Sequence, residues 1–176
     1  ANYPSYSARA TAWSQIMPDR MNLPQRRGPK PETTSSLPHS QVTQHGPGAV
    51  IGKLHAWCFS LPNVNEDDSG ISVPGSRALI LQDGVPSNPE AFMIGREFAH
   101  IHPHPDSGSM HLHLTAEDAR EVCASGWGEN HYLVGQGQWR EGLVLVFSPR
   151  DDTELETVKA IVTRSYEFAT GTSLTA

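Results

Sequence analysis

The sequence has little of what defines several common protein classes. It has only two cysteines, Cys58 and Cys123, which lie far apart and form no CxxC pattern. This excludes a disulfide framework and a zinc finger, and we expect two buried thiols. No apolar run approaches the roughly 20 residues that a transmembrane helix needs, and no signal-peptide pattern is visible. We therefore expect a cytoplasmic protein with no membrane segment, associated with a membrane only if an N-terminal anchor has been removed.

Basic residues are scarce in most of the chain. The formal net charge is −6, and residues 1–47 carry five basic and two acidic groups, whereas the remainder carries eight basic and seventeen acidic groups. An acidic main body disfavours nucleic acid as the principal ligand. We therefore expect no nucleic-acid partner.

Hydrophobic patterns predict an α+β fold in one domain. Alternating or short apolar runs indicate strands, which we expect at residues 49–61, 77–82, 92–104, 109–114 and 142–147. Helical spacing indicates helices, which we expect at residues 7–17, 115–125 and 149–171. Residues 62–75 are expected to form a polar, acidic loop. The expected architecture is a mainly antiparallel sheet of about five strands with two C-terminal helices on one face.

Short polar signals mark the ends of the two C-terminal helices. Thr115 with Asp118, and Thr153 with Glu156, form pairs that satisfy free amides at a helix start. Gly171 is expected to end the last helix.

Prolines dominate the N-terminal part of the chain. We divide it from the rest as a Pro-rich arm, residues 1–47, followed by a single domain, residues 48–176. The prolines exclude a regular helix or a central strand. The segment is either a disordered linker or an ordered arm that wraps on the domain, with Arg26, Arg27 and His39 reaching carboxylates.

Histidine is concentrated in one stretch, residues 97–114. It holds five of the nine histidines of the chain, His100, His102, His104, His111 and His113. The turn-forming sequence at residues 105–108 separates two apolar arms and predicts a β-hairpin. Because side chains alternate between the two faces of a strand, the histidines of each arm share one face.

The register of this hairpin decides whether the two sets of histidines meet. If His102 lies opposite His111, then His100 lies opposite His113 and four imidazoles converge. If His102 lies opposite Leu112, the two sets point to opposite faces of the sheet. The residues themselves leave both registers open.

A histidine cluster supports two mechanisms. In the first, neutral imidazoles bind a single transition metal ion such as Fe, Cu, Zn or Mn, with a carboxylate from Glu97 or Glu129. The candidate ligands are His102, His104, His111 and His113. In the second, no metal is present, and the histidines act as general bases and hydrogen-bond donors toward an acidic organic substrate.

Further candidates lie outside the hairpin. Glu129 and His131 lie on the same side if their segment is extended, so that Glu129 would orient His131. Trp127 would stack on a flat aromatic ligand. Arg150 would pair with a substrate carboxylate or with the acidic residues beside it. Asp106 is interpreted as a turn residue.

Three sequences in the chain resemble the luciferase domain of bioluminescent fungi and its non-luminous relatives. These are residues 97–114, the GWGE sequence at 126–129 and the SPRDDTELE sequence at 148–156. The resemblance extends from about residue 23 to residue 171. The sequence RRGPKPETTSSLPHSQ resembles the proline-rich entry segment of that family, which favours an ordered arm over a linker.

The resemblance implies a small oxygenase of fungal secondary metabolism. The luciferases of the family act on a hydroxylated pyrone–styryl luciferin with O2, through a cyclic peroxide that loses CO2. By resemblance, this chain would bind a flat, enolisable, polyketide-like molecule and oxygenate, decarboxylate or cyclise it, with either no cofactor or one transition metal ion.

The resulting assignment of residues covers the hairpin and its surroundings. The catalytic candidates are His100, His102, His104, His111, His113, Glu129 and His131. The candidates for binding the substrate are Trp127, Arg150, Arg27 and His39. The alternative function is a binding module that uses the same histidine-lined groove without turnover.

Overall fold

The computed structural model describes residues 20–174. The helix expected at residues 7–17 lies outside this range. Within the range, the α+β class and the mainly antiparallel sheet are confirmed, although the sheet has six strands rather than about five. In spatial order the strands are β1 (Val64–Asp68), β2 (Arg77–Leu81), β3 (Glu97–Ile101), β4 (Met110–His113), β6 (Leu143–Val146) and β5 (Gly128–Asn130).

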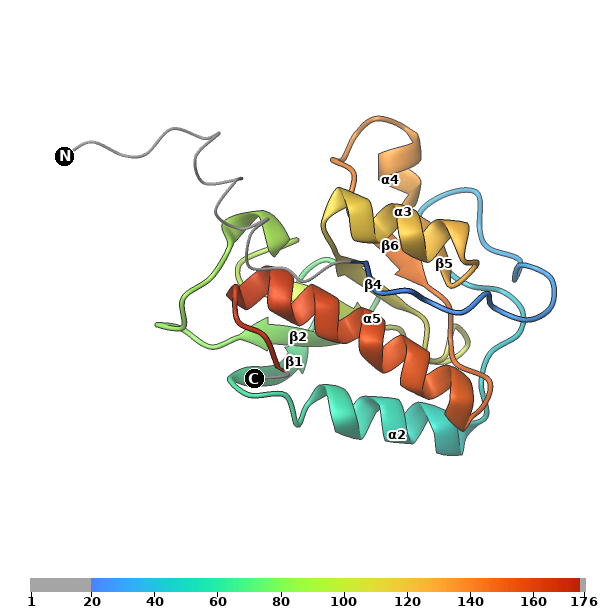
Figure 1. The fold of residues 1–176 in the computed structure, drawn as a ribbon, viewed down its shortest axis with the longest axis horizontal. Helices are drawn as coiled ribbons and strands as arrows, with labels where there is room; N and C mark the ends of the chain where they lie inside the picture. Colours follow the sequence, from blue (N-terminus) through green and yellow to red (C-terminus); the bar gives the residue numbers. More distant parts are fainter. Residues whose placement is uncertain (1–19, 175–176) are drawn as a thin grey trace.

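Helices cover one face of the sheet and enclose the hydrophobic core (Figure 1). The long helix α5 (Asp152–Thr170) contacts β3 and β4, and α2 (Gly48–Cys58) packs beside it. Helix α3 (Ala116–Ala124) contacts β5 and β6. Two short elements, α4 (Tyr132–Gly135) and the 3-10 turn η1 (Pro89–Ala91), complete the described fold. None of the helices between residues 20 and 174 is both long and apolar enough to cross a membrane.

Residues 49–61 are not a strand, and this prediction is corrected. They form α2, which buries Val50, Leu54 and Cys58 at a spacing of four residues. The alternation in the sequence is equally compatible with this helical stripe, which faces α5. The loop predicted for residues 62–75 is also wrong in part, because it contains the edge strand β1.

Most of the remaining predicted elements are found close to their expected positions, but the strand predicted at residues 92–104 is shorter, since β3 spans only Glu97–Ile101. Strands β2 and β6 and helix α3 are confirmed, and the Thr115 side chain accepts a hydrogen bond from the amide of Asp118. Helix α5 is capped by Asp151, which accepts from the amide of Glu154, and not by Thr153. Gly171 ends α5 with a positive φ of 68°, as expected.

The described part of the N-terminal arm, residues 20–47, is ordered on the domain. Arg27 pairs with Asp151 at 2.8 Å, as expected of the arm. Arg26 instead donates to the side-chain oxygen of Gln44 at 3.2 Å rather than to a carboxylate. The indole N–H of Trp127 donates to the backbone of the arm at Pro24. The arm thereby joins the domain on the side of β5.

A β-bulge in β3 changes which side chains face together. Leu79 lies opposite Ala99 and Ile80 opposite Glu97, so one extra residue is inserted into β3 at this point. Simple alternation would put Glu97 and His100 on opposite faces of the strand. The bulge instead brings the Glu97 carboxylate to the ring of His100.

Candidate active site

The pairing of β3 with β4 brings histidines from both strands together on one face. His100 lies opposite His111, and the amide of His102 donates to the carbonyl of Ser109 at 2.9 Å. The histidines therefore converge, as in the first of the two registers considered, but the pairing is displaced by two residues. His113, two residues after His111 on β4, consequently has no histidine opposite it on β3.

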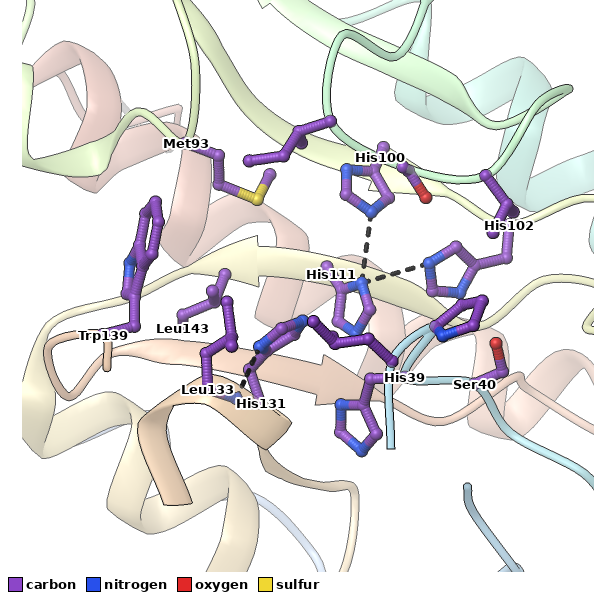
Figure 2. Close-up of a pocket in the computed structure, with 15 residues that line it drawn as sticks. His39, Ser40, Met93, His100, His102, His111, His131, Leu133, Trp139 and Leu143 are labelled. Atoms are coloured by element: carbon purple, nitrogen blue, oxygen red, sulfur yellow. Dashed lines mark hydrogen bonds between the residues drawn. The ribbon is translucent and has the colours of Figure 1, made fainter. Parts of the chain in front are cut away.

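Three imidazoles meet at a single point. Nδ1 of His111 lies 3.1 Å from Nε2 of His100 and 3.1 Å from Nε2 of His102 (Figure 2). All three side chains are buried. The histidines are therefore not a solvated face of the hairpin.

Two carboxylates hold the outer nitrogens of this cluster. Nδ1 of His100 lies 2.8 Å from Glu97, and Nδ1 of His102 lies 3.0 Å from Asp106. Burial alone would raise the pKa of each carboxyl, but hydrogen bonds from the histidines and from neighbouring donors lower both pKa values. Both groups are therefore carboxylates at neutral pH. An ionised carboxylate can only accept a hydrogen bond, so Nδ1 carries the hydrogen in His100 and His102.

Asp106 is a site residue that the sequence did not reveal. It was interpreted as a turn residue, yet it is buried. Its carboxylate also accepts from the hydroxyl of Ser109 at 2.6 Å and from the amide of Gln41 at 3.1 Å. In the sequence it stands in a Pro-Asp-Ser-Gly turn, and no local pattern distinguishes it from an ordinary turn residue.

Two further histidines approach the cluster from other elements. His39 comes from the arm, and its ring stacks on His111 with centroids 5.5 Å apart. His131 precedes α4, and its ring centroid lies 4.4 Å from that of His111. Of the expected supporting residues, Glu129 does not orient His131. It accepts from Nε2 of His39 at 2.8 Å instead.

One hydrogen bond determines which nitrogen of His131 carries the proton. Its Nδ1 accepts from the amide of Leu133 at 3.1 Å, so the neutral ring carries its proton on Nε2. Burial, together with the field of His39, lowers the pKa of His131 to about 4. Burial and the neighbouring His102 and His100 lower the pKa of His111 well below its usual value. Both rings are therefore neutral at pH 7.

The other predicted site residues lie elsewhere. His104 is exposed on the connection between β3 and β4. His113 is buried and accepts from the indole N–H of Trp139 at 2.9 Å, and burial lowers its pKa to about 4. Trp127 is a core residue. Arg27 pairs with Asp151, as described above, and Arg150 pairs with Glu154.

The histidines form one wall of a cavity of about 460 Å³. Figure 2 shows His39, His100, His102, His111 and His131 together on one side, and Met93, Trp139 and Leu143 toward the other. The apolar lining consists of Leu37, Pro38, Ile71, Val73, Met93, Leu133, Trp139 and Leu143. A cavity of this size, largely apolar with a few convergent polar groups, is typical of small-molecule sites. Trp139, rather than Trp127, supplies the aromatic surface.

The histidine cluster lies within a region that matches a known protein family. Residues 95–165 match the Luciferase domain family. A luciferase of Armillaria ostoyae is 30% identical over 170 residues, covering 85% of this chain and 62% of that protein. A luciferase of Neonothopanus nambi is 34% identical over 92 residues, covering 49% of this chain and 33% of that protein.

These relatives are longer than the chain. The chain spans 62% of the length of the Armillaria luciferases that it matches. No solved structure gives a significant match. The resemblance recognised in the sequence is confirmed: residues 95–165 match the Luciferase domain family, and the chain is similar to the fungal luciferases over most of its length.

Proposed function

We propose that this chain is an oxygenase of the luciferase type that binds a flat, enolisable, pyrone-like molecule in the histidine-lined cavity. The observation that carries the proposal is the cavity itself, in which imidazoles face an apolar wall and several of them come from the region that matches the Luciferase domain family. Its volume accommodates a molecule of two or three rings. The relatives named luciferase support an oxygenase-type enzyme.

The two walls of the cavity suit the two ends of such a substrate. A styryl or similar apolar end would lie against Trp139 and Met93, where aromatic stacking is favourable. The acidic enol would then face the rings of His100, His102 and His111. This orientation places the most acidic group of the substrate beside the proton acceptors of the site.

The histidine wall can remove a proton and stabilise negative charge. A neutral imidazole with a free nitrogen lone pair accepts the enol proton, and the resulting anion is electron-rich enough to react with O2. The Nε2–H group of His131 is a donor for the oxygen atom on which negative charge develops. The Nε2–H group of His39 is already committed to Glu129.

The test is O2 uptake by the full chain with a panel of hydroxylated 6-styryl-2-pyrones. Each pyrone is paired with its O-methylated form, which has no enol proton to lose. We expect uptake with the free enol only. Because general acid–base catalysis contributes roughly 10²–10⁴-fold, the His111→Ala variant should be slower by about that factor.

The matched control is His104→Ala, which removes an exposed histidine of the same hairpin. It should retain the uptake rate of the wild type. Equal rates for His111→Ala and the wild type, or equal consumption of the methylated pyrone, would contradict the proposal. Measuring CO2 and light in the same reaction distinguishes oxygenation from a decarboxylation or a light-emitting reaction.

A further inference from the structure

The three nitrogen atoms that meet in the histidine cluster include more hydrogen-bond acceptors than donors. The Nδ1–H groups of His100 and His102 are donated to Glu97 and Asp106, so both Nε2 atoms point inward as acceptors. Both of these atoms lie 3.1 Å from Nδ1 of His111. A neutral His111 has a single proton. If that proton is on Nδ1, it can be donated well to only one of the two acceptors.

His111 therefore does not complete a hydrogen-bond network. The second short contact brings two lone pairs together, which is unfavourable in a buried site. The other nitrogen, Nε2, is itself buried and has no hydrogen-bond partner among the described residues. Buried polar atoms are nearly always satisfied in folded proteins. The arrangement thus favours a positive centre among the three nitrogens.

We propose that this centre is a single divalent transition metal ion, bound by Nε2 of His100, Nε2 of His102 and Nδ1 of His111. The metal replaces the missing protons, because each lone pair then points at a cation. Glu97 and Asp106 complete the site from outside, since histidine ligands of metals typically donate their other N–H to a carboxylate. Both carboxylates have that position here.

The spacing of the nitrogens fits a common coordination sphere. For metal–nitrogen bonds of about 2.0–2.1 Å, ligand angles between 90° and 109° place the nitrogens roughly 2.8–3.4 Å apart. The two measured separations are both 3.1 Å. The ligand atoms of all three residues lie within 4.8 Å of one another.

The ligand set also defines the class of metal and the kind of site. Three neutral imidazoles favour Fe, Co, Ni, Cu or Zn over Mg or Ca, which prefer oxygen ligands. Three protein ligands leave at least one position free, as in catalytic rather than structural sites. All three histidines line the cavity, so the free position faces the space where a ligand binds. A metal there would act as a Lewis acid toward an enolate oxygen.

A second group of three histidines is less suitable. His39, His111 and His131 also lie within bonding reach of a common point. However, His39 uses Nε2 for Glu129 and Nδ1 for the amide of Tyr132. His131 uses Nδ1 for the amide of Leu133. Metal binding by His39 would therefore break a hydrogen bond. In the first group, the three ligand nitrogens accept no hydrogen bond from a protein group outside the cluster, so none is broken.

The metal site stands on this ligand geometry and does not rest on the proposed reaction. If the metal is bound, the lone pairs that would accept the enol proton are committed to it. The metal test therefore uses no substrate. O2 uptake without metal would leave the proposed function intact, and metal binding without O2 uptake would leave the site intact.

The experiment measures metal content in the full chain, purified without a histidine tag. The protein is stripped with a chelator, reloaded with Fe(II), Co(II), Cu(II) or Zn(II), desalted and subjected to elemental analysis. We expect about one ion per chain for at least one metal in the wild type and in His104→Ala. His102→Ala and His111→Ala should retain less than a tenth of this. The Co(II) form should show a visible absorption spectrum typical of three nitrogen ligands.

A conservative variant protects the test against misfolding. Asp106→Asn retains all three ligands and should weaken metal affinity by roughly 10–100-fold, as is typical of outer carboxylates. Circular dichroism of each metal-free variant checks the fold. Stoichiometric metal that is unchanged in both His102→Ala and His111→Ala would overturn the proposal, and so would a folded wild type that retains none of the four metals.

Discussion

At the scale of residues, two carboxylates determine how the histidines present themselves to the cavity. Glu97 and Asp106 each accept a hydrogen bond from the outer nitrogen of a histidine. This fixes the tautomer, so the lone pair of the inner nitrogen faces the pocket. Without the carboxylate, each imidazole would rotate or exchange its proton between nitrogens. The chemistry proposed for the site would therefore depend on residues that do not line the cavity.

Replacing Asp106 tests this dependence. Asp106→Asn retains the volume of the side chain but introduces an NH2 group where the carboxylate accepts from Gln41 and Ser109. We expect kcat for O2 uptake to fall by at least about 10-fold, with the fold intact. The measurement is steady-state kinetics beside thermal unfolding. Asp83→Asn, at an exposed turn, is the control, and an equal kcat in both variants would contradict the role of Asp106.

Trp139 is the second residue whose role is testable. It is held in place by its hydrogen bond to His113 and forms part of the apolar wall. Because aromatic stacking contributes about 0.5–1.5 kcal/mol, Trp139→Ala should raise KM for a styryl-pyrone by roughly 3–10-fold. Trp139→Phe preserves a flat ring and should change KM much less. If both variants have the KM of the wild type, the substrate does not lie on this wall.

At the scale of elements, α2 illustrates where sequence patterns fail. Residues 49–61 alternate well enough for a strand, yet the chain buries the helical stripe of Val50, Leu54 and Cys58 against α5. Two glycines, Gly48 and Gly52, weaken the helical signal. The distinction depends on a partner helix about a hundred residues away, which no local pattern contains. By contrast, α3 carries its own cap and stripe, and it was predicted with nearly correct bounds.

A glycine in α2 provides a test of this element. Gly52 is exposed in the middle of the helix, and an added Cβ would meet nothing within 4 Å. Gly52→Ala should therefore raise the free energy of unfolding by about 0.5–1 kcal/mol. Chemical denaturation measures the change. A loss of stability would show that residues 49–61 are not a stable helix in solution.

Gly128 is the contrasting control for that measurement. It lies in β5, where an added Cβ would be 2.4 Å from the backbone oxygen of Leu145. Gly128→Ala should lower the free energy of unfolding by about 1–3 kcal/mol, as is typical of overpacking. The same substitution thus has opposite signs in the two elements.

The histidine hairpin was predictable only in part. The period of two in the sequence places the histidines of each strand on one face, but pairing with the other strand is a long-range choice. The bulge in β3 brings Glu97 and His100 together, although simple alternation would place them on opposite faces of the strand. Asp106 belongs to the connection between the two strands of the hairpin, and His39 belongs to the arm. These contacts depend on the whole fold.

At the scale of the whole molecule, the arm closes the site by attaching to the domain. His39 reaches Glu129 of β5 and stacks on His111 of β4, and Gln41 donates to Asp106. Leu37 and Pro38 contribute to the lining of the cavity. The arm is therefore part of the pocket, and it is ordered, as the resemblance of its sequence to the family's entry segment implied.

The attachment of the arm should depend on pH. Burial would raise the pKa of Glu129, but hydrogen bonds from His39 and Lys30 outweigh it and lower the pKa from 4.5 to about 2. A lowered pKa in the folded state contributes stability above pH 4.5, and this stability is lost as the pH falls toward 2. The full contribution is about 3 kcal/mol at most. The free energy of unfolding between pH 6 and pH 3, measured with urea, should fall less steeply in Glu129→Gln than in the wild type.

Glu32→Gln is the control for the pH measurement, since Glu32 is an exposed carboxylate of the same arm. Its pH profile should follow that of the wild type. If Glu129→Gln also follows the wild type, the pair of Glu129 and His39 does not hold the arm on the domain.

The proposed reaction and the proposed metal site depend on one structural feature, the inward lone pairs of His100 and His102. The most direct measurement of this feature is ¹⁵N NMR of the histidine rings in the metal-free chain at pH 7. We predict that both rings carry their proton on Nδ1, whereas the exposed His104 shows the Nε2–H preference of a solvated imidazole. If His100 and His102 instead carry their proton on Nε2, as expected of His104, the carboxylates do not orient them, and the lone pairs needed by the proposed reaction and the proposed metal site are absent.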